Sequence, residues 1–269
     1  MNRGEQNVEF KFSKLTLRYK ALKEQVANQI EMYMHLVGTV GPRLKDKYML
    51  LVGQLECRAA GLETAARRWK RRFELRQQYL NRGEKPDLIA IEAMLDREFA
   101  EYLAKLASCA KEIEHATLRW NEKKMSESDT NDIRCAYLKA VKKLHPDINN
   151  ELSEAAKSLW NQIQDSYHKK DWEHLKFLVS LVDDITAETK RFAATPDGLE
   201  ALGYACAQLE AKGQEIAKQI ADLKKKPPFA HEALMDDPEM LERKQNGIKE
   251  RITALKATIK KYESRWNND

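Results

Sequence analysis

Apolar side chains recur every three or four residues along most of this 269-residue chain, and that spacing constrains the fold more than any other feature. The longest stretches cover 9–37, 42–80, 87–124 and 197–267. A helix over 42–80 would be about 58 Å long, which suits a coiled coil better than a compact core. Only 10 Gly and 7 Pro interrupt the chain, and 33% charged residues supply solvated faces. We therefore predict an all-α protein with long antiparallel coiled-coil arms.

The chain divides into three predicted parts. An N-terminal long-helix bundle covers 1–125, a short helical module covers 126–184, and a C-terminal helical hairpin covers 185–269, which opens with a connector that ends near Pro196. Eight apolar stripe positions lie on each side of the break at Pro227-Pro228, so the two arms of the hairpin are self-complementary. Pairing between two copies of the chain is the alternative, and it would give a homo-oligomer.

Glycine and proline mark the predicted breaks within the first part. Gly38 and Gly41-Pro42 are expected to end the first helix, with Pro42 in the first turn of the next. The stretch Asn81–Pro86 reads as a turn before the third helix. We expect the last turns of that third helix, through Leu118 and Trp120, to cover the module that follows.

The segment 132–147 predicts a short basic amphipathic helix that ends in a tight loop. Its apolar stripe is formed by Ile133, Ala136, Tyr137, Ala140 and Leu144. Pro146 has no backbone N–H and disfavours helix at the residue before it, so the helix should stop near Leu144. A second helix begins near Glu151, so the two helices form a hairpin with His145 and Asp147 at its tip.

These residues resemble the J-domain, the module by which J-proteins act on Hsp70 chaperones. The family's second helix reads Ile-Arg-x-Ala-Tyr and ends in His-Pro-Asp, and this sequence has Ile133-Arg-Cys-Ala-Tyr137 and His145-Pro-Asp147. Its third helix carries an aromatic residue, Ile and Tyr at the spacing of Trp160, Ile163 and Tyr167 here. The resemblance covers roughly 128–183, about a fifth of the chain.

The resemblance implies a co-chaperone that stimulates ATP hydrolysis by an Hsp70 partner. It implies that the basic helix docks on an acidic face of Hsp70 while the loop perturbs contacts that restrain hydrolysis. The expected Hsp70-binding residues are His145, Pro146, Asp147, Arg134, Tyr137, Lys139, Lys142 and Lys143. The coiled-coil arms would recruit Hsp70 to a client protein that the sequence does not identify.

Departures from the family pattern keep a second hypothesis open. The family's usual first helix is missing, and Leu138 stands where Lys or Arg is common. No Gly/Phe-rich segment or paired zinc module follows. The alternative is a structural coiled-coil adaptor whose J-like hairpin does not act on Hsp70.

Other signals favour ordinary structural roles. The run Arg67–Arg72 is basic and aromatic, but Trp69 fits the apolar stripe, so we favour a solvated helix face over a nucleic-acid site. Glu112 and His115 have the spacing of di-iron bundles without the second motif that such a site needs. No catalytic constellation or phosphate-binding loop is present. We therefore expect no enzyme activity, cofactor or metal site.

Composition places the protein in a broad class. The net charge of +5 permits an anionic partner without requiring one. The four cysteines are widely spaced and form no metal-binding pattern, which is typical of buried thiols in a reducing compartment. No apolar run approaches the roughly 18 residues of a membrane span, and the N-terminus lacks a secretion signal. We expect a cytoplasmic protein with no membrane contact.

Overall fold

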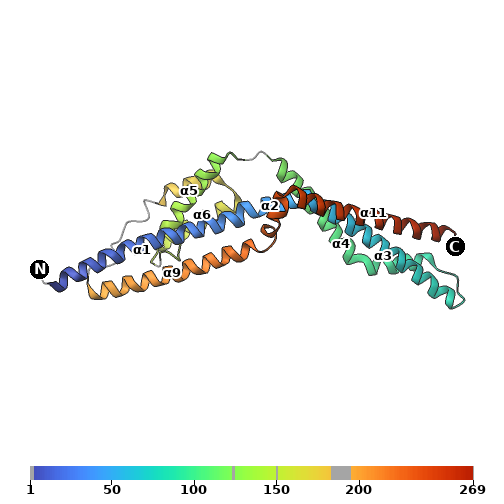
Figure 1. Ribbon diagram of the computed structural model, residues 1–269, viewed down its shortest axis with the longest axis horizontal. Helices are drawn as coiled ribbons and strands as arrows, with labels where there is room; N and C mark the ends of the chain where they lie inside the picture. Colours follow the sequence, from blue (N-terminus) through green and yellow to red (C-terminus); the bar gives the residue numbers. More distant parts are fainter. Residues whose placement is uncertain (1–2, 123–124, 150, 183–194, 269) are drawn as a thin grey trace. The chain divides into compact units, whose positions relative to one another are not determined.

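The computed structural model of the protein describes residues 3–122, 125–149, 151–182 and 195–268. Every regular element in these ranges is helical, which confirms the all-α class (Figure 1). The elements are α1 (Arg3–His35), η1 (Leu36–Val40), α2 (Gly41–Tyr48), η2 (Met49–Gly53), α3 (Gln54–Asn81), α4 (Leu88–Asn121), α5 (Glu127–Leu144), α6 (Glu154–Lys169), α7 (Trp172–Ser180), α9 (Pro196–Lys224), η3 (Phe229–His231), α10 (Glu232–Asp236) and α11 (Pro238–Asn268).

The chain forms two compact units, and each is assembled from two separate segments. Unit 1 contains Met1–Gly41 and Lys123–Lys226, and unit 2 contains Pro42–Glu122 and Pro227–Asp269. These two units differ from the predicted division into 1–125, 126–184 and 185–269. The physical reason is burial: the apolar face of α1 is covered by α5 and α9, so α1 shares its core with the short helical module.

Within unit 1, α1 and α9 lie side by side and run in the same direction (Figure 1). The Cys206 thiol lies 3.9 Å from the Leu15 carbonyl oxygen, and Arg18 binds Glu210 further along both helices. Because both residue numbers rise together, the pair is parallel. The core of unit 1 joins this pair to α5, α6 and α7 through apolar side chains of all five helices.

Within unit 2, α3 lies between an antiparallel and a parallel neighbour. Arg72 binds Glu92 at 2.6 Å, and the α2 residue Asp46 accepts two hydrogen bonds from Arg119, so α4 runs antiparallel to the α2–α3 stretch. The ring centroids of Phe73 and Tyr262 lie 5.7 Å apart. Lys244 binds Glu56 nearer the start of both helices, so α11 runs parallel to α3.

The two arms of the predicted C-terminal hairpin belong to different compact units. Its first arm, α9, packs on α1 in unit 1, and its second arm, α11, packs on α3 in unit 2. The stripe positions themselves are helical and apolar as predicted, and Leu202, Cys206 and Ile252 are buried. An apolar spacing of three and four residues shows that a helix packs against another helix, but it does not identify that helix. Proximity in sequence therefore did not predict which helices pair.

The chain also stays helical where we predicted a break at Gly38 and Gly41-Pro42. Residues 36–40 form a wider π-helical turn, in which the Gly41 N–H donates to the Leu36 carbonyl. Such turns occur as single insertions within α-helices, and this one directly precedes the proline that lacks an N–H donor. The break at 81–86 is present, and Gly83 there has φ of 76°, which favours glycine.

The predicted connector 183–196 lies outside the described residues, apart from its last two positions. Thr195 caps α9 by accepting a hydrogen bond from the Gly198 N–H at 3.1 Å, and Pro196 occupies the first turn. Both features are favoured at helix N-termini. Across the described ranges, none of the helices combines the length and the apolarity that crossing a membrane requires.

Candidate functional site

The J-like module begins with a capped basic helix, α5. The Ser126 hydroxyl accepts a hydrogen bond from the Asp129 N–H at 3.0 Å, which satisfies a free donor of the first turn. Acidic residues lie in that first turn and Lys142 and Lys143 in the last, as the helix dipole favours. The helix ends at Leu144, directly before His145-Pro146, so the predicted stop is confirmed.

The loop after α5 is a hydrogen-bonded turn that displays Pro146 and Asp147 to solvent. The His145 carbonyl accepts from the N–H groups of Ile148 and Asn149 at 3.0 and 2.9 Å. The Asp147 N–H donates to His145 Nδ1 at 3.1 Å. The imidazole packs edge-on against Trp160, with ring centroids 5.0 Å apart. His145 is therefore held in one orientation by its own loop and by α6.

Helix α6 supplies the aromatic wall behind the loop. Ser153 caps it, and its buried face carries Trp160, Ile163 and Tyr167 at the predicted spacing. Asp171 then caps the short helix α7, whose Leu175 and Leu178 join the same core. The two helices α5 and α6 thus form the hairpin that the sequence predicts, with the His-Pro-Asp residues at its tip.

Helix α1 covers this hairpin. Val26, Ala27 and Ile30 of α1 are buried in the core with the apolar face of α5. Leu118, which we expected in that role, is 61% exposed and belongs to unit 2. The expectation was wrong because it chose the apolar residues nearest in sequence, whereas the cover comes from the distant N-terminal helix.

Arg134 is paired inside the chain, although its side chain is partly exposed. Its guanidinium donates two hydrogen bonds to the Glu31 carboxylate of α1, at 2.7 and 2.9 Å. Glu31 is only 5% exposed. Hydrogen bonding to Glu31 raises the pKa of Arg134. A two-point pair with a buried carboxylate therefore holds the Arg134 guanidinium within unit 1, and its role in docking stays a prediction.

Tyr137 is also a core residue. It is fully buried, with ring centroids 4.3 Å from Tyr167 and 5.9 Å from Trp160. Burial raises the pKa of its hydroxyl, and no described protein group hydrogen-bonds to that oxygen. Tyr137 therefore lies in the core of unit 1, and its predicted place among the Hsp70-binding residues stays a prediction.

The lysines of α5 differ in their surroundings. Lys142 is bound to Glu24 of α1. Lys139 is exposed and Lys143 is half-buried. Lys139 and Lys143 thus remain on the surface of the module, as predicted, and Lys142 shares its charge with α1.

Asp147 is bound by a residue of α9. Lys212 Nζ lies 3.1 Å from Asp147 Oδ2 and also 3.1 Å from Glu215. The hydrogen bond to Asp147 raises the pKa of Lys212. Burial lowers the pKa of His145, with Asp147 opposing the shift and Lys212 adding to it. The loop tip is therefore electrostatically linked to α9.

Sequence reasoning missed Glu24, Glu31, Lys23 and Lys212, the residues that hold the module from outside. Lys23 donates to Asn149 Oδ1 at 2.8 Å, so α1 also holds the loop. Glu24 and Glu31 are seven residues apart, which places them on one face of α1 beside its apolar stripe. That spacing was the available signal, although it does not identify the helix they meet.

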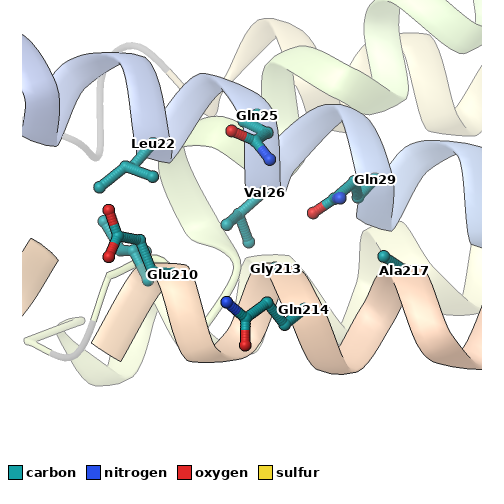
Figure 2. Close-up of a pocket in the computed structure, with 9 residues that line it drawn as sticks. Leu22, Gln25, Val26, Gln29, Glu210, Gly213, Gln214 and Ala217 are labelled. Carbon is teal, nitrogen blue, oxygen red and sulfur yellow. The ribbon is translucent and has the colours of Figure 1, made fainter. Parts of the chain in front are cut away.

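A hollow of about 270 Å³ lies between α1 and α9, and Gly213, the residue after Lys212, lines it (Figure 2). Gln25 and Gln29 of α1 and Glu210 and Gln214 of α9 line it, together with five smaller or apolar residues. The Gln29 Oε1 atom is buried, and no described group donates to it. A Cβ added to Gly213 would lie 3.1 Å from that atom, so the glycine lets the helices approach here.

The other predicted signals fall in unit 2. Arg68, Arg71 and Arg72 bind carboxylates of α4, so the basic run serves the α3–α4 contact. Glu112 binds Lys45 at 3.1 Å. In the part of the chain that the structure describes, no group of three or more His, Cys, Asp or Glu side chains is placed to hold a metal ion.

Comparisons with known proteins add no assignment. A scan of protein-family models, a search of curated proteins and a search of solved structures found no match to this chain.

Proposed function

We propose that this protein is a J-domain co-chaperone that stimulates ATP hydrolysis by an Hsp70 partner. The observation that carries the proposal is the loop tip: His145-Pro146-Asp147 joins a basic helix to an aromatic-backed helix, and Pro146 and Asp147 are exposed. A purely structural hairpin needs neither an ordered histidine nor an exposed carboxylate at its tip.

In this proposal the protein does no chemistry on ATP and lowers a barrier in its partner. Lys139 and Lys143 attract an acidic face of Hsp70, and this long-range attraction mainly raises the association rate. Asp147 then accepts hydrogen bonds from an arginine of the partner at short range. When that arginine binds Asp147, it leaves a contact within Hsp70 that restrains hydrolysis. The ordered His145 ring keeps the loop in one geometry.

We further propose that the helical pairs select the client, and that the protein works in the cytoplasm, where an Hsp70 has ATP. The apolar stripes are largely used inside each unit, so a client would meet the outer faces. Ile89 and Leu118 of α4 are exposed apolar side chains on such a face. A homo-oligomer formed through these faces is the alternative use of the same surface.

The test is steady-state ATP hydrolysis by Hsp70 at substoichiometric amounts of this protein. We expect stimulation by the wild type and none by Asp147→Asn. Asp165→Asn is the matched control, because Asp165 is an exposed α6 carboxylate that pairs with Lys169 in its own helix. Equal stimulation by all three proteins, or by none, would reject the co-chaperone function.

A second candidate is favoured by a specific observation. Arg134, Tyr137 and Asp147 are all engaged within unit 1, by Glu31, by the aromatic core and by Lys212. These contacts suit a structural adaptor in which the J-like hairpin packs against α1 and α9 and stabilises their pairing. The adaptor predicts no effect on ATP hydrolysis by any variant, so the same experiment separates the two functions.

A further inference from the structure

Lys142 and Asp147, two predicted docking residues, are already paired inside unit 1 with residues of opposite charge. Glu24 supplies a carboxylate to Lys142, as an acidic partner face would. Lys212 supplies a cation to Asp147, 3.1 Å away, as a partner arginine would. Helices α1 and α9 therefore occupy the two polar ends of the candidate site with internal substitutes for the partner.

These two contacts differ from the Glu31–Arg134 pair in their exposure. The side chains of Lys212 and Asp147 are 31% and 37% exposed, and that of Glu24 is 60% exposed. The Glu31 side chain is 7% exposed. Water and competing charges reach the first two contacts, so they contribute little to stability and exchange readily. The Glu31–Arg134 pair is buried on the carboxylate side and fixes the fold.

The packing next to Lys212 also permits exchange. Gly213 has no side chain, and the hollow beside it is lined by Gln25, Gln29 and Gln214 (Figure 2). The hollow is also lined by Leu22, Val26, Leu209 and Ala217, so polar and apolar side chains meet around this gap in the α1–α9 packing. Lys212 directly precedes Gly213 on this part of α9, and its own ion pairs with Asp147 and Glu215 are partly exposed.

We propose that Glu24 and Lys212 compete with Hsp70 for Lys142 and Asp147, so that α1 and α9 keep the docking site in a closed state of lower affinity. This inference rests on the proposed co-chaperone function and concerns the regulation of its site. Because a fraction of molecules must open before docking, the apparent affinity is reduced by that fraction. Any event that draws Glu24 or Lys212 away raises the affinity for Hsp70 without changing the loop.

The experiment measures the concentration of full-length protein that gives half-maximal stimulation of Hsp70 ATP hydrolysis. Lys212→Gln and Glu24→Gln remove one internal competitor each; the first shortens the side chain by one atom and the second keeps its length. We expect each to lower the half-maximal concentration about two- to fivefold, with the maximal rate unchanged. Lys218→Gln on α9 and Glu9→Gln on α1 are the controls, because each removes a charge of the same sign from an exposed position of the same helix, and they should leave the half-maximal concentration unchanged.

The outcomes separate this inference from the function on which it rests. If Asp147→Asn abolishes stimulation but Lys212→Gln and Glu24→Gln behave as the wild type, the function holds and the competition is rejected. A raised half-maximal concentration in Lys212→Gln also rejects it, since Lys212 would then aid docking. If no variant stimulates hydrolysis, the co-chaperone function fails and the competition fails with it. Thermal melting checks that each variant is folded.

Discussion

Glu31 and Arg134 join α1 to α5 through two parallel hydrogen bonds, Nε to Oε1 at 2.7 Å and Nη2 to Oε2 at 2.9 Å. The carboxylate is buried and the guanidinium is partly exposed. The two partners are therefore unequal. Loss of Arg134 leaves the buried Glu31 carboxylate without a counter-charge, whereas loss of Glu31 leaves the Arg134 guanidinium, which solvent partly reaches.

The first prediction follows from this asymmetry. Arg134→Ala should lower the free energy of unfolding by about 3 kcal/mol, because it strands the buried Glu31 carboxylate. The double variant with Glu31→Ala should recover part of that loss. Lys142→Ala breaks an exposed pair and should cost less than about 1 kcal/mol. Urea unfolding measures all three, and equal costs for the two single variants would contradict the structure.

The second prediction concerns the aromatic wall of α6. Trp160 is 4% exposed and contacts both Tyr137 and His145. Trp160→Ala should cost about 3–5 kcal/mol, as truncation of a buried aromatic side chain does. Phe177→Ala is the control, since Phe177 is exposed on α7 and should change stability by less than about 0.5 kcal/mol. Circular dichroism melts that do not separate the two variants would count against a buried Trp160.

The third prediction is a pH dependence set by His145. Burial holds its folded pKa below the ordinary 6.5, so the neutral ring is favoured by folding. Stability from this group is fully present above the unfolded pKa of about 6.5 and is lost as the pH falls toward the folded pKa. Protonation of Nδ1 also breaks the hydrogen bond from the Asp147 N–H.

An NMR titration of the His145 ring measures this pKa directly. We expect a midpoint below 6.5, and we expect Lys212→Gln to raise it, because the lysine charge opposes protonation. A midpoint above 6.5 in the wild type would show that the Asp147 carboxylate outweighs burial.

The fourth prediction tests the salt dependence of docking. Lys139→Gln and Lys143→Gln should each weaken Hsp70 binding at low salt and reduce its decline as salt rises, because charges at or near the surface act at a distance that ions screen, with the larger effect from the exposed Lys139. Lys157→Gln removes an exposed charge of α6 that pairs with Glu154 and is the control. Binding curves over a salt series measure the effect, and a salt response that both α5 variants leave intact would exclude steering by these lysines.

The fifth prediction tests the division into two units. Leu209 of α9 is buried in the core of the J-like module, whereas Ile252 of α11 is buried in unit 2. Leu209→Asp should therefore accelerate amide hydrogen exchange in α5, because it places a charge in the shared core. Ile252→Asp should accelerate exchange in α3 and leave α5 protected. Loss of protection in α5 from both variants would mean that the units do not open separately.

The local features of the module were predictable from sequence because their causes are local. Ser126 caps α5 at its start, and the helix ends at Leu144, two residues before Pro146. Trp160 faces inward at helical spacing. Capping, the missing N–H of proline and apolar periodicity each act within a few residues of the chain. They therefore place the hairpin and its tip without knowledge of the rest of the fold.

The contacts that decide the site were not predictable, because they come from residues more than sixty positions away. Glu31 meets Arg134, and Lys212 meets Asp147, across helices whose pairing no local pattern encodes. Tyr137 shows the same difficulty. Its place on the apolar stripe predicts that it is buried, but it does not predict which helix covers it. Helical periodicity specifies faces, whereas the choice and direction of the partner depend on the assembled core.

The parallel pairing of distant helices has a consequence for protein synthesis. The face of α1 that α9 covers, and the face of α3 that α11 covers, stay bare until those later helices leave the ribosome. At about 5–20 residues per second, α1 waits roughly 8–30 s for α9. Nascent chains that end before Pro196 should therefore bind a hydrophobic dye more strongly than chains that extend past Asn268. During that interval the growing polypeptide is itself exposed to aggregation and depends on protection by other proteins.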